Sequence, residues 1–220
     1  FKGQLEELEI QHPELKAATS PTSRVGSDLN SSFNKVLHAH PMLSISNTYN
    51  GDEIQDFINQ TEKLLENTDN EFVVESKIDG VSMALVYEDR VLIQAVTRGD
   101  GLQGDDITEN AKTLKDVPLT LSDAAPLGRF EVRGEVYMEN SAFTELNKQF
   151  AAEGKKIMQN PRNATAGSLK LKHARETARR PLRYFAYALV GDATTESHSK
   201  NMELLKELGF NVNHYTLTQT

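Results

Sequence analysis

Apolar positions divide the chain into a helical start and a strand-rich remainder. Phe1, Leu5 and Leu8 follow a helical spacing, and a second helix opens at Asn50, where Glu53 three residues later forms a capping pattern. We expect the first two of the strands that follow to pair as a hairpin around a tight Asp-Gly turn. β-Branched and aromatic residues predict these strands over 71–75, 81–87, 91–96 and 130–138.

The second half of the chain alternates helices with one further strand. Helix-start residues and apolar spacing predict helices that begin at Asp105, Pro161 and Ser199, and a further helix that Asn140 caps. The segment 181–190 is almost continuously apolar, which predicts a central strand buried on both faces. Ser, Pro, Gly and Asn make the stretch 20–32 a predicted loop.

The strand over 130–138 separates two chemically different faces. Glu131, Arg133, Glu135 and Tyr137 project to one side, and the other side is apolar. An exposed network of cross-strand ion pairs is one interpretation of the polar face. The other is the floor of a cleft, where carboxylates bind ribose hydroxyls or a metal ion.

The stretch from Glu75 to Gly80 places a lysine between two carboxylates. Side chains two apart in a strand share a face, so Glu75, Lys77 and Asp79 project together. A lysine amine is a nucleophile when desolvation lowers its pKa, and a phosphate-binding point charge when it does not. An exposed salt bridge at a sheet edge is the plainer interpretation, because so short a motif recurs by chance.

A glycine-rich loop over 97–104 follows the next strand. Its glycines allow backbone N–H groups to approach an anion. Arg98 at its base can pair with phosphate or carboxylate through two parallel hydrogen bonds. The loop is therefore a second candidate contact for a phosphate.

Composition places the chain among soluble globular proteins. Its 220 residues suit one large domain, with 38% apolar and 25% charged residues. The absence of cysteine excludes disulfides and thiolate metal sites and fits a reducing cytoplasm. No apolar run could span a bilayer and no signal peptide opens the chain, so we expect a cytoplasmic protein with no membrane partner and no metal site of its own.

Charge is distributed unevenly along the chain. The net charge is −8, but the tract from Lys155 to Arg183 holds nine Lys or Arg and a single acid, Glu176. That tract carries +8 and the remainder therefore carries −16. A basic tract on an acidic body indicates either a local phosphate-binding surface or a solvated helical charge run.

Six ordered tracts together resemble the adenylation domain of bacterial NAD-dependent DNA ligases, along essentially the whole chain. The K-x-D-G element alone is shared with ATP-dependent ligases and capping guanylyltransferases, whereas the ordered set is specific to the NAD-dependent group. The tracts are Ser20–Gly26, Pro41–Ile45, Glu75–Gly80, Thr97–Gly104, Glu131–Val136 and Asn160–Leu169.

The resemblance implies an α+β nucleotidyltransferase fold, ATP-grasp-like, with antiparallel sheets, flanking helices and a nucleotide cleft between them. Residues 1–45 would be a helical lead-in and loop of an N-terminal subdomain, and residues 46–220 a nucleotidyltransferase core that is incomplete at its C-terminal end. The family's nicotinamide mononucleotide motif, later lysine motifs and zinc-bearing C-terminal region fall outside this sequence. We therefore expect a fragment, trimmed at both ends, that does not adenylate itself alone.

The resemblance also implies a reaction. Lys77 matches the lysine that takes AMP from NAD and releases nicotinamide mononucleotide. The AMP then passes to the 5′-phosphate of a nick in double-stranded DNA, and the 3′-hydroxyl displaces it, in DNA replication and repair. Such transfer depends on positioning and charge neutralisation, so Mg²⁺ and cationic side chains are expected. The resemblance also implies a monomer, which is the usual state of the family.

Nucleotide-binding roles follow residue by residue from the same resemblance. The Ser44-Ile45 pair and Glu75, with Asp79 of the same motif, would contact the adenosine, and Tyr187 would stack on the adenine.

The remaining roles concern the ribose and the phosphates. Arg98 would hold the ribose or phosphate region and Glu135 the ribose. Arg162 and Lys170 would face phosphates of the nucleotide or of nicked DNA. The family usually has arginine at the position of Lys170, so the charge is kept but the planar guanidinium is not.

Two other functions stay open. One is an ATP- or GTP-dependent nucleotidyltransferase of the same superfamily, which cofactor preference distinguishes. The other is a non-catalytic nucleotide- or DNA-binding remnant, for which nick binding without self-adenylation would be the sign.

Overall fold

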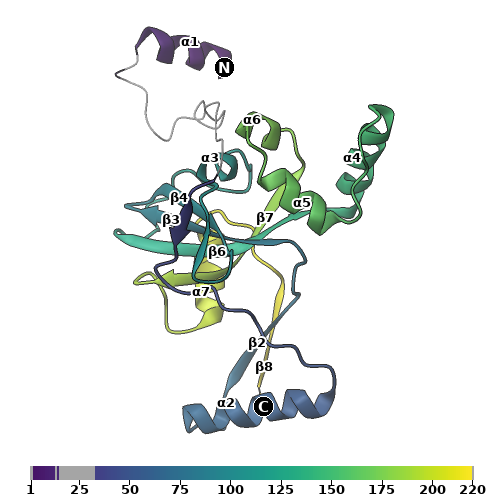
Figure 1. Ribbon diagram of the computed structural model, residues 1–220. Coiled ribbons are helices and arrows are strands. Elements are labelled where there is room, and N and C mark those ends of the chain that lie inside the picture. Colours follow the sequence, from purple (N-terminus) through teal and green to yellow (C-terminus); the bar gives the residue numbers. More distant parts are fainter. Residues whose placement is uncertain (1, 13, 15–32, 220) are drawn as a thin grey trace.

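A four-stranded antiparallel sheet forms the centre of the computed structural model, which describes residues 2–12, 14 and 33–219 (Figure 1). The strand order is β4-β3-β6-β7. Helices α5 (Pro161–Leu169) and α7 (His198–Glu207) pack against this sheet and bury their apolar residues with it. The strands are β3 (Val81–Glu88), β4 (Val91–Thr97), β6 (Arg129–Met138) and β7 (Leu182–Gly191).

Two small sheets accompany the central one. β1 (Lys35–Leu37) pairs with β5 (Gln103–Asp105). β2 (Glu71–Glu75) pairs with β8 (Tyr215–Gln219), and α2 (Gly51–Leu65) lies beside that pair, away from the central sheet (Figure 1). Antiparallel sheets with helices confirm the predicted α+β class.

The predicted hairpin between 71–75 and 81–87 is wrong. β2 pairs with β8, whereas β3 pairs with β4 on one side and β6 on the other. Because both edges of β3 are occupied, residues 76–80 form an extended link between two sheets.

The prediction of a central, doubly buried strand over 181–190 is also wrong. β7 is an edge strand of its sheet, and its burial alternates. Leu182, Tyr184 and Ala186 belong to the core, while Phe185 and Tyr187 face the opposite side. The second face is apolar because it lines a cavity.

Helix starts mostly follow the capping signals in the sequence. The Asn50 side chain accepts a hydrogen bond from the Glu53 N–H at 2.9 Å, and Asn160 caps α5 in the same way. The predicted cap at Asn140 is wrong by one residue, because Glu139 is the N-cap of α4 (Asn140–Ala152) and makes no side-chain capping bond.

The remaining helices are short or peripheral. The helix predicted from Asp105 is only the single turn α3 (Thr108–Ala111), and α6 (Ala174–Thr177) is equally short. α1 (Lys2–Gln11) confirms the predicted N-terminal helix, whereas the predicted loop over 20–32 lies outside the described residues. None of the helices that the structure describes is long and apolar enough to cross a membrane.

A β-bulge on β7 lies at Tyr187. The register with β6 runs from Arg133↔Ala188 directly to Gly134↔Ala186, so Tyr187 has no partner residue. Bulges re-aim side chains and are common beside functional sites.

Gly134 makes this close strand pairing possible. A Cβ at this position would lie 2.1 Å from the carbonyl oxygen of Phe185 and 2.4 Å from the ring of Tyr184. The Tyr184 ring cannot move aside, because it is fully buried and its hydroxyl donates to the Val132 carbonyl at 3.1 Å.

Replacing Gly134 with alanine should therefore destabilise the fold. The added methyl group meets backbone that cannot give way, and overpacking of this kind costs about 1–3 kcal/mol. We expect Gly134→Ala to lower the free energy of unfolding by at least that amount in urea titrations. Gly51→Ala is the matched control, because no atom lies within 4 Å of its added Cβ. Equal stability of the two variants would contradict this account.

Candidate active site

A cavity of about 550 Å³ lies over the face of the central sheet that is turned away from the core. Its floor comes from β6 and β7, and its walls come from the segment around Ser44, the link after β2 and the start of α7. The cavity collects most of the predicted site residues: Ser44, Ile45, Glu75, Lys77, Arg98, Glu135 and Tyr187.

Gly80 is the glycine of the K-x-D-G element, and the structure shows why a larger residue would not fit there. The link 76–80 passes so close to β6 that a Cβ on Gly80 would lie 2.1 Å from the carbonyl oxygen of Val136. This close approach sets Lys77 at the rim of the cavity. Within the described part of the chain, its ammonium group forms no hydrogen bond or ion pair. An unpaired cation beside a cavity is available to an incoming anion.

Glu135 is a partly buried carboxylate on the cavity floor. Burial raises its pKa above the usual glutamate value. A hydrogen bond from the Ser82 hydroxyl to Oε2, at 2.8 Å, and the nearby charge of Lys77 partly offset that increase. The carboxylate can therefore accept a hydrogen bond from a ligand hydroxyl. Because burial disfavours its charged form, this position lowers the stability of the fold.

Glu75 enters the cavity from the end of β2. Its pairing with Tyr215 on β8 fixes the backbone, and its Oε1 lies 3.2 Å from Nε2 of His198 at the start of α7. Asn213 also donates to the carbonyl oxygen of Ser76, next to Glu75. Residues from the C-terminal third thus hold the first part of the K-x-D-G segment.

Tyr187 gives the cavity an aromatic wall. Strand alternation places it on the same side as Phe185, the bulge on β7 adds Ala188 to that side, and all three line the cavity. Burial raises the pKa of the Tyr187 hydroxyl, which keeps this group neutral. A half-buried, uncharged ring of this kind suits stacking on a planar heterocycle.

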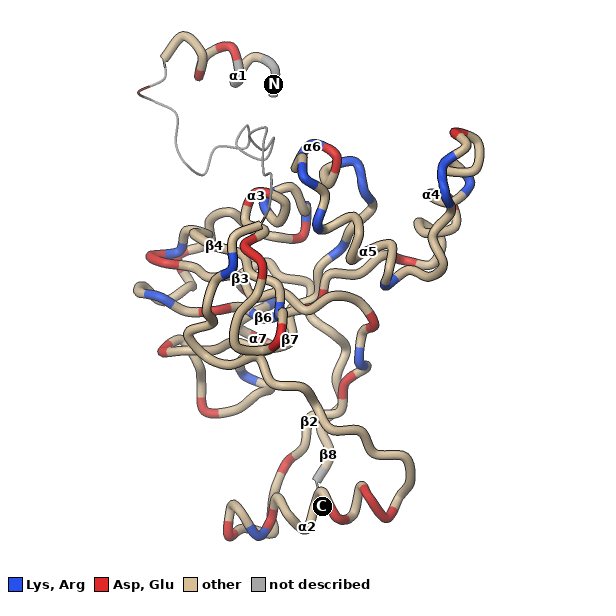
Figure 2. The backbone as a smooth tube through the Cα atoms, viewed as in Figure 1, with Lys and Arg blue, Asp and Glu red and all other residues tan. Residues whose placement is uncertain are grey.

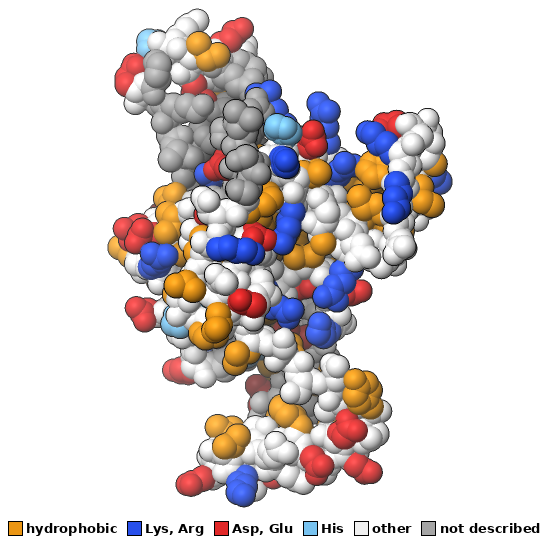
Figure 3. All heavy atoms as spheres, viewed as in Figure 1, with side chains coloured by type: hydrophobic (Ala, Val, Ile, Leu, Met, Phe, Trp, Pro, Cys, Tyr) orange, Lys and Arg blue, Asp and Glu red, His pale blue; other side chains and the backbone are white. Residues whose placement is uncertain are grey.

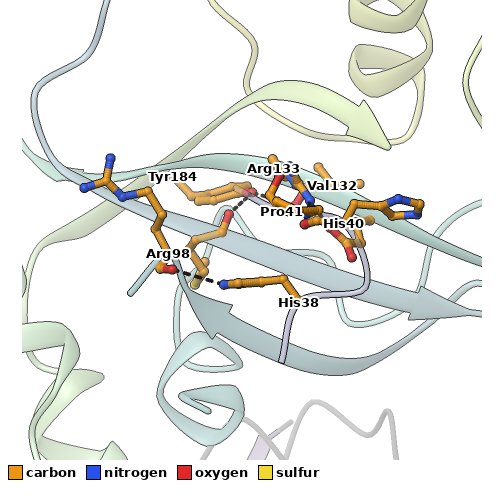
Figure 4. Close-up of polar contacts among 9 residues, drawn as sticks. His38, His40, Pro41, Arg98, Val132, Arg133 and Tyr184 are labelled. Atoms are coloured by element: carbon orange, nitrogen blue, oxygen red, sulfur yellow. Dashed lines mark hydrogen bonds and ion pairs between the residues drawn. The ribbon is translucent and has the colours of Figure 1, made fainter. Parts of the chain in front are cut away.

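Arg133 anchors the cavity wall that carries Ser44 (Figure 4). Its guanidinium donates to the carbonyl oxygens of His40 at 2.5 Å and Pro41 at 3.0 Å. It also donates from Nη2 to Oε2 of Glu131 at 2.9 Å, and this ion pair is largely buried. The wall is thereby attached directly to the central sheet.

A second set of contacts attaches this wall to the glycine-rich loop. The Met42 N–H donates to the carbonyl oxygen of Gly101 at 2.8 Å, and the His38 ring donates to that of Arg98 at 3.1 Å (Figure 4). The Arg98 side chain then lies 3.4 Å from the Ser44 hydroxyl. Two tracts that are distant in sequence thus form one wall.

Three predicted site residues are already paired. Asp79 and Arg162 form an exposed ion pair at 3.1 Å, and neither lines the cavity. Lys170 lies at the end of α5 and pairs with Asp105 at 2.5 Å, also outside the cavity lining. Arg162 and Lys170 therefore do not converge on one point.

Sequence reasoning missed several residues of the cavity. Arg133 was noticed only as part of an alternating strand, and its contact with His40 and Pro41 has no local signal. Ser82, His198 and Asn213 were not predicted at all. Their places follow from strand pairing across the fold, which short motifs do not encode.

The residues that line the cavity are of the types that bind a nucleotide. The cavity combines an aromatic ring, two carboxylates and cationic side chains, as ligand sites of this size do. Among residues 2–12, 14 and 33–219, no group of three or more His, Cys, Asp or Glu could hold a metal ion. These residues thus fit a nucleotide better than a resident metal.

Several known proteins are similar to this chain in sequence. Residues 30–220 match the family model for the NAD-dependent DNA ligase adenylation domain. The chain is 44% identical over 210 residues to a protein of Bacteroides fragilis named DNA ligase, covering 95% of this chain and 31% of that protein. A DNA ligase of Petrotoga mobilis is 46% identical over 212 residues, covering 96% and 31%.

A third relative, the DNA ligase of Marinobacter nauticus, is 44% identical over 214 residues and covers 96% of this chain and 32% of its own length. The chain thus spans about a third of the length of these curated relatives. The family model, in contrast, covers nearly all of the chain. The chain belongs to the NAD-dependent DNA ligase adenylation domain family.

Proposed function

We propose that the cavity binds the adenylyl half of NAD and that Lys77 takes the AMP group. Nζ of Lys77, as the free amine, forms a P–N bond with the α-phosphorus while the bond from phosphorus to the bridging oxygen breaks. Nicotinamide mononucleotide leaves with that oxygen, and the amine's proton passes to solvent. The observation that supports this most is an unpaired lysine at the rim of a nucleotide-sized cavity with an aromatic wall.

The side chains around Lys77 have separate roles in this proposal. Tyr187 stacks on the adenine, and the Ser44-Ile45 pair with Glu75 contacts the adenosine. His198 orients the Glu75 carboxylate through their contact.

The remaining contacts concern the ribose and the phosphate. Glu135 accepts from a ribose hydroxyl, and Arg98 binds the phosphate or ribose region from the glycine-rich loop. Asp79 supports this site through Arg162, with which it is paired. Mg²⁺ is expected from the family, and no step here passes through it.

The later steps extend this chemistry to DNA. AMP would pass from Lys77 to the 5′-phosphate of a nick in double-stranded DNA, and the 3′-hydroxyl would displace it and seal the strand. In the same proposal, the protein is a monomeric, cytoplasmic bacterial protein. Its nucleotidyltransferase fold is related to that of ATP-grasp enzymes. Residues 1–45 would belong to an N-terminal subdomain and 46–220 to the core.

AMP attachment to Lys77 is the direct test. Because the chain spans a third of its relatives, it is assayed alone and joined to the flanking segments of the Petrotoga mobilis protein. We expect the longer protein to gain the mass of one AMP with NAD and not with ATP, mapped to Lys77. The chain alone should gain none.

Lys77→Ala and Lys77→Arg in the longer protein should both abolish that gain, since neither offers a nucleophilic amine. Undiminished adenylation of either variant would contradict the assignment. A gain with ATP alone would favour the ATP-dependent alternative. DNA binding without any adenylation would favour a non-catalytic remnant.

Stacking by Tyr187 predicts a measurable share of AMP affinity. Base–aromatic stacking contributes about 1–3 kcal/mol, so Tyr187→Ala should raise the Kd for AMP by about five- to 150-fold in calorimetry on this chain. Tyr187→Phe keeps the ring and should stay within about threefold of the wild type. Equal loss in both variants would mean that the ring does not stack.

The raised pKa of Glu135 predicts opposite effects on stability and on binding. The folded state favours the protonated form, so folded chains bind more protons and wild-type stability falls as pH rises through the acid range. Glu135→Gln removes that cost and should be more stable than wild type at pH 7. The difference should vanish below the ordinary glutamate pKa.

The same variant should bind AMP more weakly, because an amide accepts less strongly from a ribose hydroxyl than a carboxylate does. Urea titrations from pH 4 to 8 and AMP calorimetry at pH 7 measure the two effects. A pH-independent stability difference would contradict the electrostatic account.

A further inference from the structure

A second cavity, of about 510 Å³, lies between the segment after α3, the start of α4 and the α6–β7 connection. It is polar, and its lining includes four cationic side chains against two carboxylates. No role in the proposed adenylation involves it. The cationic residues are Lys115, Arg179, Arg180 and Arg183, and the carboxylates are Asp116 and Glu139.

Both carboxylates of this cavity are occupied by one arginine. Nε of Arg183 donates to Oδ2 of Asp116 at 2.6 Å, and its Nη1 donates to Glu139 at 3.1 Å. The hydrogen bond that Arg183 donates to Asp116 raises the pKa of Arg183 above its usual value. Asp116 also accepts from the Tyr184 N–H, so it is fixed to the start of β7.

The other three cations form no salt bridge with a carboxylate in the described part of the chain, although the charge of Arg180 acts on Glu153. Lys115 and Arg179 are exposed and unpaired there. Arg180 packs its guanidinium 4.9 Å from the ring centroid of Phe150, and its Nε is buried without a hydrogen-bond acceptor among the described residues. A buried donor without an acceptor normally requires one from a ligand or water.

The second cavity lies at the start of β7, where Arg183 lines it from the face of the nucleotide cavity and Leu182 lines it from the core face. On β7, Arg183 lies two residues from Phe185 and four from Tyr187, so all three point to one side, about 13 Å apart end to end at 3.3 Å per residue. The stacked rings of Tyr137 and Phe185, 5.1 Å between centroids, separate the two cavities.

The charge around the second cavity fits a polyanion. Basic residues gather along α5, α6 and the segment between them, whereas α2 at the other end is mainly acidic (Figure 2). Their side chains lie exposed on the surface of this region (Figure 3). A duplex whose nick faces Lys77 must continue along the surface on either side, and phosphate contacts fix the register of such a duplex.

We propose that this second cavity binds a backbone phosphate of the duplex beside the nick, through Lys115, Arg179 and Arg180. This assignment rests on the proposed function for its substrate, nicked DNA. It differs from the sequence prediction, which gave the phosphate role to Arg162 and Lys170, each of which already pairs with an aspartate. The cavity thus orients the duplex, while the first cavity holds the nucleotide.

The test measures binding of a fluorescent nicked duplex to this chain by anisotropy, from about 50 to 200 mM salt. Lys115→Gln with Arg179→Gln removes two exposed charges, and Arg129→Gln with Lys206→Gln is the charge-matched control outside the cavity. We expect the cavity variant to bind about tenfold more weakly at 100 mM salt, with a salt slope shallower by about 1. The control pair should stay within about threefold of wild type.

Three outcomes would overturn the proposal. The first is an equal loss of duplex affinity in the cavity and control variants. The second is no measurable binding of the duplex by the wild-type chain at the lowest salt. The third is a loss of affinity for free AMP in the cavity variant that equals its loss of affinity for the duplex. The last result would assign the cavity to a nucleotide phosphate. Failure here leaves the AMP attachment to Lys77 untouched, because that experiment contains no DNA.

Discussion

The buried ion pair between Arg133 and Glu131 attaches one wall of the first cavity to the central sheet. Its side chains are only 11% and 7% exposed, and a buried pair is weak evidence for stability, since desolvation offsets most of the attraction. Here the guanidinium also satisfies the carbonyl oxygens of His40 and Pro41, more than 90 residues away in sequence. Its main effect is therefore geometric. It fixes the wall that carries Ser44 against the sheet, so the site depends on a tertiary contact that no local motif supplies.

The central sheet uses its two faces for different purposes. The core face is closed by α5, α7 and the fully buried ring of Tyr184, and it supplies the hydrophobic stabilisation. The opposite face lines the first cavity, with Phe185 and Tyr187 directed toward it by strand alternation and Ala188 by the bulge. Burial of Glu135 on this face costs stability, a cost that well-packed residues on the other face offset.

Local patterns predicted the elements of this fold well and their partners poorly. Capping at Asn50, the helix start at Pro161 and the alternation over 130–138 depend on neighbours in sequence, and each was correct. The pairing of β2 with β8 depends on residues about 140 positions apart, so the predicted hairpin failed. The apolar run over 181–190 was misread for a related reason: a strand whose second face lines a cavity has the same sequence pattern as one buried in the core. Most of the cavity residues were predicted from the resemblance to a known family. A resemblance of this kind carries information on contacts between residues that are far apart in sequence.

Counting charges along the sequence also overstated how many cations are available to a ligand. The basic tract over 155–183 carries +8, yet Arg162, Lys170 and Arg183 are each paired with a carboxylate. A paired cation must exchange its partner before it can bind a phosphate, which cancels much of the gain. Lys77, Lys115 and Arg179 have no such partner among the described residues, and only one of them lies in the tract. The positions of acidic side chains in the fold therefore decide which cations an anionic substrate can use. The number of basic residues in a stretch of sequence does not.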